Sequence, residues 1–151
     1  MNGCQRLLCL GLALYAVGAV SACGKDETPT SPTTTTTTTQ TAAAASVTEA
    51  FSGTVAVSGS RFYAFEVGTF GTVTVTLDRV GGGTVPSSVW VGVGLGVPEG
   101  TDCSTTTSLN TQSGSGPHLN TTLSAGTYCA RIYDIGNLAA PAPFAITIAH
   151  P

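Results

Sequence analysis

The chain of 151 residues carries five Lys and Arg residues against eight Asp and Glu residues, so its net charge is −3 at pH 7. Only 9% of its residues are charged, and no lysine follows Lys25. Without a basic cluster, the sequence argues against nucleic acid, or an anionic membrane surface bound through basic side chains, as a partner.

The first 22 residues have the pattern of an export signal. Arg6 precedes an uncharged apolar run from Leu7 to Val20. As a helix this run would span roughly 21 Å, which is short of the roughly 30 Å core of a bilayer. Small residues at Ser21 and Ala22 suit a peptidase. We therefore predict a signal peptide over 1–22 rather than a transmembrane helix.

The stretch Val20-Ser21-Ala22-Cys23 resembles the lipobox of bacterial lipoproteins. The resemblance implies a diacylglyceryl group on the Cys23 thiol, cleavage before Cys23, and a fatty acyl chain such as palmitate on the new amino terminus. Two or more such chains hold a protein stably to a bilayer. Gly24 in place of an aspartate implies, by the same resemblance, sorting to the outer membrane. The alternative is an ordinary signal peptide in which Cys23 is incidental.

Residues 23–46 read as a linker that follows the anchor. Seven consecutive threonines run from Thr33 to Thr39, and no aliphatic residue larger than alanine occurs between Gly24 and Ser46. Such a segment buries too little apolar surface to offset its ordering entropy, so we expect a disordered spacer. A site for O-linked sugars is the alternative interpretation.

Two cysteines remain after the signal peptide and the anchor are set aside. Cys4 and Cys9 belong to the signal, and Cys23 is the predicted lipidation site. Cys103 and Cys129 would then form an even pair in an oxidising compartment, which predicts one disulfide. Two buried thiols are the alternative.

The segment 47–151 is long enough for one domain, and apolar and polar residues alternate along most of it. Thr72 to Leu77 alternates without a fault, which sends Val73, Val75 and Leu77 inward. Similar alternation predicts seven short strands and no helix, hence an all-β antiparallel sandwich. The expected strands are 51–57, 61–67, 72–77, 88–97, 118–123, 127–133 and 144–149.

Three of these stretches resemble bacterial pre-peptidase C-terminal domains. LSAGTYCARIYD (123–134) is similar to the family's L-x-x-G-x-Y-x-x-x-V stretch, RFYAFEV (61–67) to its Y-x-F-x-V strand, and FAITI (144–148) to its last strand. The resemblance implies a jelly-roll-like β-sandwich that serves as a non-catalytic accessory module. Two departures are the absence of an accompanying protease and of the acidic cluster that binds calcium in some relatives.

An immunoglobulin-like sandwich is the rival architecture. Its tyrosine corner places a Tyr two residues before the second Cys, whereas Tyr128 directly precedes Cys129. The only tryptophan, Trp90, also precedes Cys103, so the usual Cys–Trp–Cys order fails. We therefore favour the jelly roll.

Catalytic and metal-binding patterns are weak. The run Gly92–Gly96 has no helix after it and is better explained as strand than as a phosphate loop. His118 and His150 lie in no nucleophile motif and are expected to be solvated. Asp134 and Asn137 are weak candidates for a calcium site, but a turn explains them without a metal. We expect no cofactor and no enzyme.

Trp90 is the one candidate for a ligand-binding face. The period of two sends Val89 and Val91 to one side of the strand and Trp90 to the other, beside Gly92 and Gly94. An open trough next to an exposed indole could grip a sugar or a partner's apolar group. The alternative is that a loop or the other sheet covers Trp90.

These features together predict a lipid-anchored protein of the cell envelope that displays a non-catalytic binding or structural module. The alternatives are an adhesion module for a polysaccharide or a protein, and a secreted hydrolase accessory or enzyme. A cleft with convergent polar groups would favour the enzyme, and flat strand faces would favour binding.

Overall fold

The computed structural model describes residues 39–151, which contain eight strands and no helix. Across this part of the chain nothing qualifies as a helix that could cross a membrane. The predicted signal peptide, the anchor Cys23 and most of the Thr-rich linker lie outside the described residues. The strands are β1 (Val47–Val55), β2 (Ser60–Val67), β3 (Gly71–Val80), β4 (Val91–Glu99), β5 (Asp102–Thr111), β6 (Leu119–Leu123), β7 (Gly126–Tyr133) and β8 (Ala142–His150).

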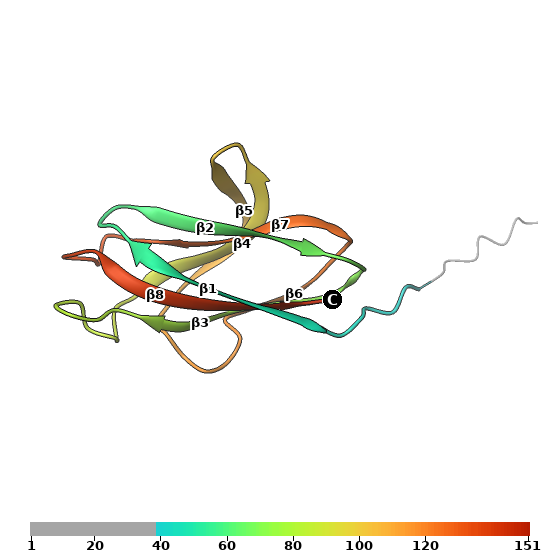
Figure 1. Cartoon of the computed structure of the whole chain (residues 1–151), viewed down its shortest axis with the longest axis horizontal. Coiled ribbons are helices and arrows are strands. Elements are labelled where there is room, and N and C mark those ends of the chain that lie inside the picture. The colour runs from blue at the N-terminus through green and yellow to red at the C-terminus, as the bar shows by residue number, and fades with distance from the viewer. Residues whose placement is uncertain (1–38) are drawn as a thin grey trace, which may run out of the picture. The chain divides into compact units, whose positions relative to one another are not determined.

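The strands form two four-stranded sheets that pack face to face (Figure 1). The first sheet has the order β1-β8-β3-β6, and the second sheet has the order β2-β7-β4-β5. All strand pairs are antiparallel. β1 pairs with β8, β2 with β7, β3 with β6 and β4 with β5. This is the arrangement of one long hairpin rolled into two layers, the jelly roll. The predicted all-β, jelly-roll-like sandwich is confirmed.

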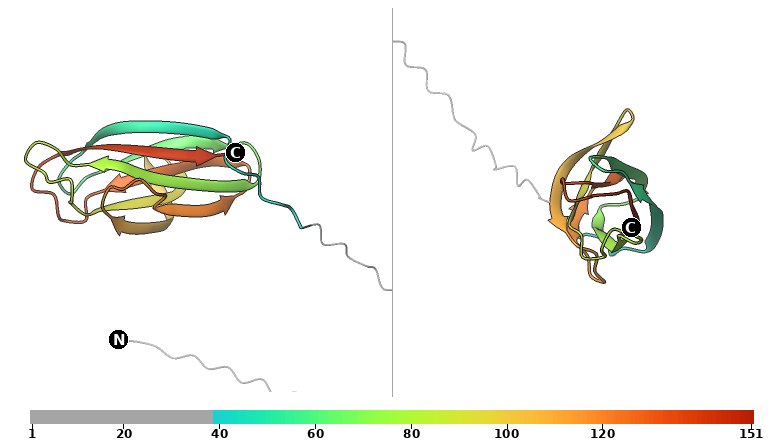
Figure 2. Two further views of the ribbon diagram at one scale, coloured as in Figure 1. Left: turned by 90° about the horizontal axis from the view of Figure 1, so that it is seen from below. Right: turned by 90° about the vertical axis from the view of Figure 1, so that its left-hand side faces the viewer.

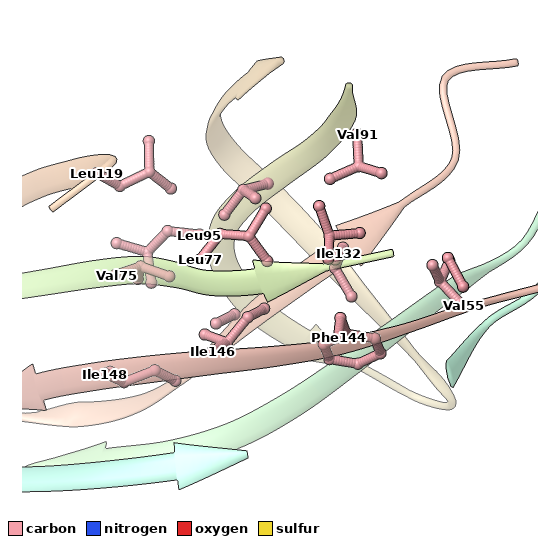
Figure 3. Close-up of a cluster of buried hydrophobic side chains, with 14 of the residues drawn as sticks. Val55, Val75, Leu77, Val91, Leu95, Leu119, Ile132, Phe144, Ile146 and Ile148 are labelled. Carbon is pink, nitrogen blue, oxygen red and sulfur yellow. The ribbon is translucent and has the colours of Figure 1, made fainter. Parts of the chain in front are cut away.

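The core lies between the sheets, and alternate residues of most strands form it (Figure 3). Each fully buried Val, Leu, Ile or Phe side chain contributes about 1.5–3 kcal/mol relative to an exposed one. Tyr63, Leu123 and Tyr128 were also expected inward and are half-buried against this core. The inward positions that are buried as predicted are Phe65, Val67, Val73, Val75, Leu77, Val89, Val91, Val93, Leu95, Leu119, Ala130, Ile132, Phe144, Ile146 and Ile148.

One strand was not predicted. The segment Asp102–Thr111 is polar apart from Cys103 and Leu109, and all but three of its residues are exposed. It forms β5 because it is hydrogen-bonded along β4, with a register shift at Leu95/Gly96. Beyond this bulge the β4–β5 hairpin projects away from the two layers, in Figure 1 and in the right-hand view of Figure 2. The sandwich therefore has eight strands rather than seven.

The chain joins the domain earlier than the predicted boundary at residue 47. Ala43 forms a parallel bridge to Gly71, through hydrogen bonds from Ala43 N to Phe70 O and from Thr72 N to Ala43 O. An added Cβ at Gly71 would lie 2.7 Å from Pro151 Cγ, so this bridge sits where β8 has ended. A Cβ at Gly71 would also collide with the Ala43 carbonyl oxygen, so the glycine makes that close approach possible.

Candidate functional site

The outer face of the second sheet carries two aromatic side chains and an arginine. Phe62 of β2, Arg131 of β7 and Gly94 of β4 occupy one row of the sheet. Tyr133 and Gly92 occupy the next row. Since the neighbouring residues Ile132 and Val93 are buried in the core, alternation directs Phe62, Arg131 and Tyr133 outward. We call this surface the outer face.

Glycines on β4 make room for what covers that strand. A Cβ at Gly92 would collide with the Tyr133 ring, and one at Gly94 would lie 2.6 Å from Thr105 Cγ2. At Gly96 it would collide with the backbone carbonyl of Ser104. The glycine run is therefore strand, as predicted. It exists because a ring and the β5 strand approach the β4 backbone closely.

A disulfide between Cys103 and Cys129 ties the hairpin to the sheet, which confirms the predicted pair. Cys103 lies just after the hairpin tip, and Cys129 is in the middle of β7. Gly100, with φ of +58°, forms the turn between β4 and β5 in a conformation that favours glycine. The link therefore fixes the end of the projecting hairpin to β7.

Arg131 of β7 contacts the hairpin tip through its guanidinium group. Its Nη1 donates a hydrogen bond to the carbonyl of Cys103 and lies 3.6 Å from Asp102 Oδ1, while Nη2 donates to Ser60 Oγ. The guanidinium carbon is 5.6 Å from the centre of the Tyr133 ring, within the range of a cation–π contact. These two hydrogen bonds use two of the five N–H donors of the guanidinium. Arg131 thus connects the hairpin, β2 and the aromatic ring.

A cleft of about 370 Å³ opens between β2 and the hairpin tip. Its lining combines an aromatic ring, hydroxyl groups and one charge of each sign. Arg61 donates from Nε to the carbonyl of Thr54, which holds that side chain beside the cleft. The lining residues are Ser60, Arg61, Phe62, Thr101 and Asp102.

Trp90 lies just before β4 and is 49% exposed, so neither a loop nor the other sheet covers it. Its carbonyl accepts a hydrogen bond from Asn137 Nδ2. The prediction of an open trough beside it is wrong. The Tyr133 ring fills the space above Gly92, and the Thr105 side chain fills the space above Gly94. What accompanies the exposed indole on this face is therefore a second aromatic ring.

A larger cleft of about 490 Å³ lies at another part of the domain and includes Glu66 and His150 in its lining. His150 is 3% exposed, and its Nε2 is 3.0 Å from Glu49 Oε1. Its ring packs 5.3 Å from that of Phe65. The expectation of a solvated His150 is wrong, since the imidazole is paired and packed. The one buried polar side chain in the lining of this cleft, His150, is therefore already paired with Glu49.

His118 also has a structural contact instead of free solvation. Its Nδ1 accepts a hydrogen bond from the backbone N–H of Leu77 at 3.0 Å, and the side chain is half-buried. The register of β3 shifts just after Leu77, and the imidazole satisfies that amide. The prediction that His118 is solvated is therefore wrong as well.

The Asp134 carboxylate is surrounded by backbone donors. Oδ1 accepts from the amides of Gly136, Asn137 and Leu138, and Oδ2 from that of Ser58. Desolvation by burial raises the pKa of Asp134, but these N–H groups outweigh it, and the pKa is lowered overall. The contacts are those of the turn interpretation. Within 39–151 no three His, Cys, Asp or Glu side chains gather as a metal-binding group.

Sequence reasoning singled out Trp90 on this face but missed Phe62, Arg131 and Tyr133. All three occur in stretches that were read only as strand pattern and family resemblance. A usable signal existed: bulky or charged residues at the outward positions of RFYAFEV and CARIY are unlike the Thr of TVTVTL. Comparisons of the chain with family models and with curated proteins find no match. The lipobox and pre-peptidase C-terminal resemblances therefore stay predictions.

Proposed function

We propose that the chain is a lipid-anchored protein of the cell envelope, held in the outer membrane by Cys23, that displays a non-catalytic binding module. The anchor rests on Val20-Ser21-Ala22-Cys23 at the end of an uncharged apolar run. The Thr-rich segment is then a spacer between the lipid and the jelly roll.

The single observation that carries the binding role is the asymmetry of the domain surface. The outer face of the second sheet carries Phe62, Tyr133 and Arg131 beside a polar cleft, whereas threonines fill most outward positions of β3 in the first sheet. Sites that bind ligands combine apolar rings with a few placed polar groups in this way.

The contacts of the histidines support a non-catalytic role. A general base must reach a nucleophile or the substrate proton. The His118 Nδ1 instead accepts a backbone amide, and His150 is buried against Glu49 and Phe65. Jelly-roll strand order also agrees with the accessory domains that the sequence resembles.

Membrane partition tests the anchor. In cells fed labelled palmitate, the wild-type chain should carry label and sediment with membranes, whereas Cys23→Ser should be unlabelled and soluble after export. Cys9→Ser is the matched control, since Cys9 is expected to leave with the signal peptide. Equal labelling and partition of Cys23→Ser and the wild type would refute the proposal.

A further inference from the structure

We propose that the outer face of the second sheet binds a neutral polysaccharide along a strip that runs from Trp90 to Phe62. The site rests on the proposed function and gives its binding module a ligand class. Phe62 forms part of the cleft at one end, the exposed Trp90 stands at the other, and Arg131 with Tyr133 lies between them.

The register gives the strip its length. Phe62, Arg131 and Gly94 share one row, and Trp90 lies four residues before Gly94 along the same strand direction. At about 3.3 Å per residue, the two ends are about 13 Å apart along the strands, with two strand spacings across. A single sugar ring cannot reach both ends. An extended chain of several sugars can.

Aromatic rings and hydrogen-bonding groups alternate along the strip, as apolar faces and hydroxyl groups do along a sugar chain. A pyranose offers an apolar face of C–H groups, which stacks on an aromatic ring, and a rim of hydroxyls, which needs hydrogen-bonding partners. Phe62 and Trp90 supply separate rings, and the Nη groups of Arg131 carry N–H donors beyond the two used within the domain, whereas its Nε–H is buried. The hydroxyl groups of Ser60 and Thr101 and the carboxylate of Asp102 surround the Phe62 end.

Charge and spacing favour a neutral sugar over a charged one or a protein. In the cleft the positive Arg61 is matched by the negative Asp102, and Asp102 also lies beside Arg131. A protein interface would instead centre on a contiguous apolar patch from which charges are depleted. Here the rings are separated by polar groups, which is how a hydroxylated polymer is held.

Trp90 is the only tryptophan of the chain, so its emission reports on one end of the strip. The full chain, solubilised in detergent micelles, is titrated with cellohexaose, chitohexaose, laminarihexaose and maltohexaose. Hexagalacturonate is the charged comparison and glucose the short one. We expect at least one neutral hexasaccharide to shield Trp90 from acrylamide, and to bind more tightly than glucose and hexagalacturonate.

Calorimetry on variants then locates the site. Phe62→Leu and Trp90→Ala should each weaken binding by about tenfold, because each removes a stacking ring, whereas Phe62→Tyr should retain it. Val47→Ala is the matched control, since Val47 is an exposed apolar residue of the first sheet. If Phe62→Leu fails to fold, Trp90→Ala at an exposed position still decides the matter.

Absence of binding by every neutral hexasaccharide would overturn the ligand class, and so would tighter binding of hexagalacturonate. Binding that survives both ring deletions would overturn the site. Sugar binding by the chain in micelles does not require that Cys23 is lipidated. A chain that is anchored but binds no sugar therefore refutes only this inference, and one that binds sugar but is not lipidated refutes only the anchor.

Discussion

The two sheets share one strand pattern but present different outer faces. In the first sheet the outward residues of β3 are Thr72, Thr74, Thr76 and Asp78. Thr147 of β8 lies beside Thr76 and donates a hydrogen bond to Asp78. In the second sheet the corresponding surface holds Phe62, Arg131, Tyr133, a glycine column and a disulfide. Both sheets bury apolar residues of their inner faces in the same core. The difference is therefore not required by the fold.

Short outward residues are sufficient for a sheet whose task is to close the core. Threonine suits a pleated, half-exposed surface, and it needs no partner beyond its neighbours and water. Rings, an arginine and a covalent tie are needed only where a surface must be shaped. We conclude that the first sheet is scaffold and the second carries the interaction surface.

Removal of the disulfide should have the largest effect, and it should act on the second sheet more than on the first. Cys103 and Cys129 are 26 residues apart, and loss of that closure should cost about 3–4 kcal/mol in the chain-entropy model. We expect the double variant Cys103→Ser/Cys129→Ser to melt at a lower temperature and its β4–β5 hairpin to exchange amide hydrogens faster. The first sheet should keep its relative protection. Uniform loss of protection across both sheets would contradict a local role for the tie.

A matched pair of substitutions compares the two outer faces directly. Gly92→Val should cost about 2–3 kcal/mol, because the new side chain must displace the Tyr133 ring. Thr74→Val places the same residue on the outer side of the first sheet and should change stability by less than about 0.5 kcal/mol. Urea unfolding of both variants measures the contrast. Equal costs would mean that the ring over Gly92 is loosely held.

Asp134 fixes the loop next to the outer face, and its loss should have a smaller effect. Asp134→Ala removes the acceptor of four backbone N–H groups and should cost about 1.5 kcal/mol. Since the folded pKa is lowered, this contribution is present above the unfolded value of 3.8 and is lost as the pH falls through the folded pKa. Unfolding measured at pH 7 and pH 2 checks it. A difference between Asp134→Ala and wild type that persists unchanged at pH 2 would contradict the charge-based account.

Calcium removal should have the smallest effect of all. The oxygens of Asp134 are engaged by amides, and Asn137 donates its side chain to the carbonyl of Trp90. We expect a chelator to leave the melting temperature unchanged. A fall that is restored by added calcium would show that the turn holds a metal ion.

The sequence predicted those parts of the fold in which burial repeats every second residue. Val73, Val75 and Leu77 were placed correctly because one face meets the core and the other meets water. β5 was not predicted because its residues are polar apart from Cys103 and Leu109. Its place is set by pairing to β4 and by the disulfide of Cys103. Periodicity carries no information on such a strand.

The site was less predictable than the fold. Trp90 could be placed on the outer side by counting, but the neighbour that fills the trough, Tyr133, comes from a strand some forty residues away in sequence. The link between Arg131 and the hairpin tip depends in the same way on tertiary approach. Side-chain partners across strands follow from register, which alternation alone does not specify.

Chemical-shift mapping of the ¹⁵N-labelled chain, titrated with the neutral hexasaccharide that binds most tightly, tests the division between the two sheets most directly. The account predicts that the perturbed resonances belong to the outer face of the second sheet, at Phe62, Trp90, Arg131 and Tyr133, while Thr72, Thr74 and Thr76 stay unperturbed. Perturbations centred on those threonines, with the outer face of the second sheet unchanged, would contradict it.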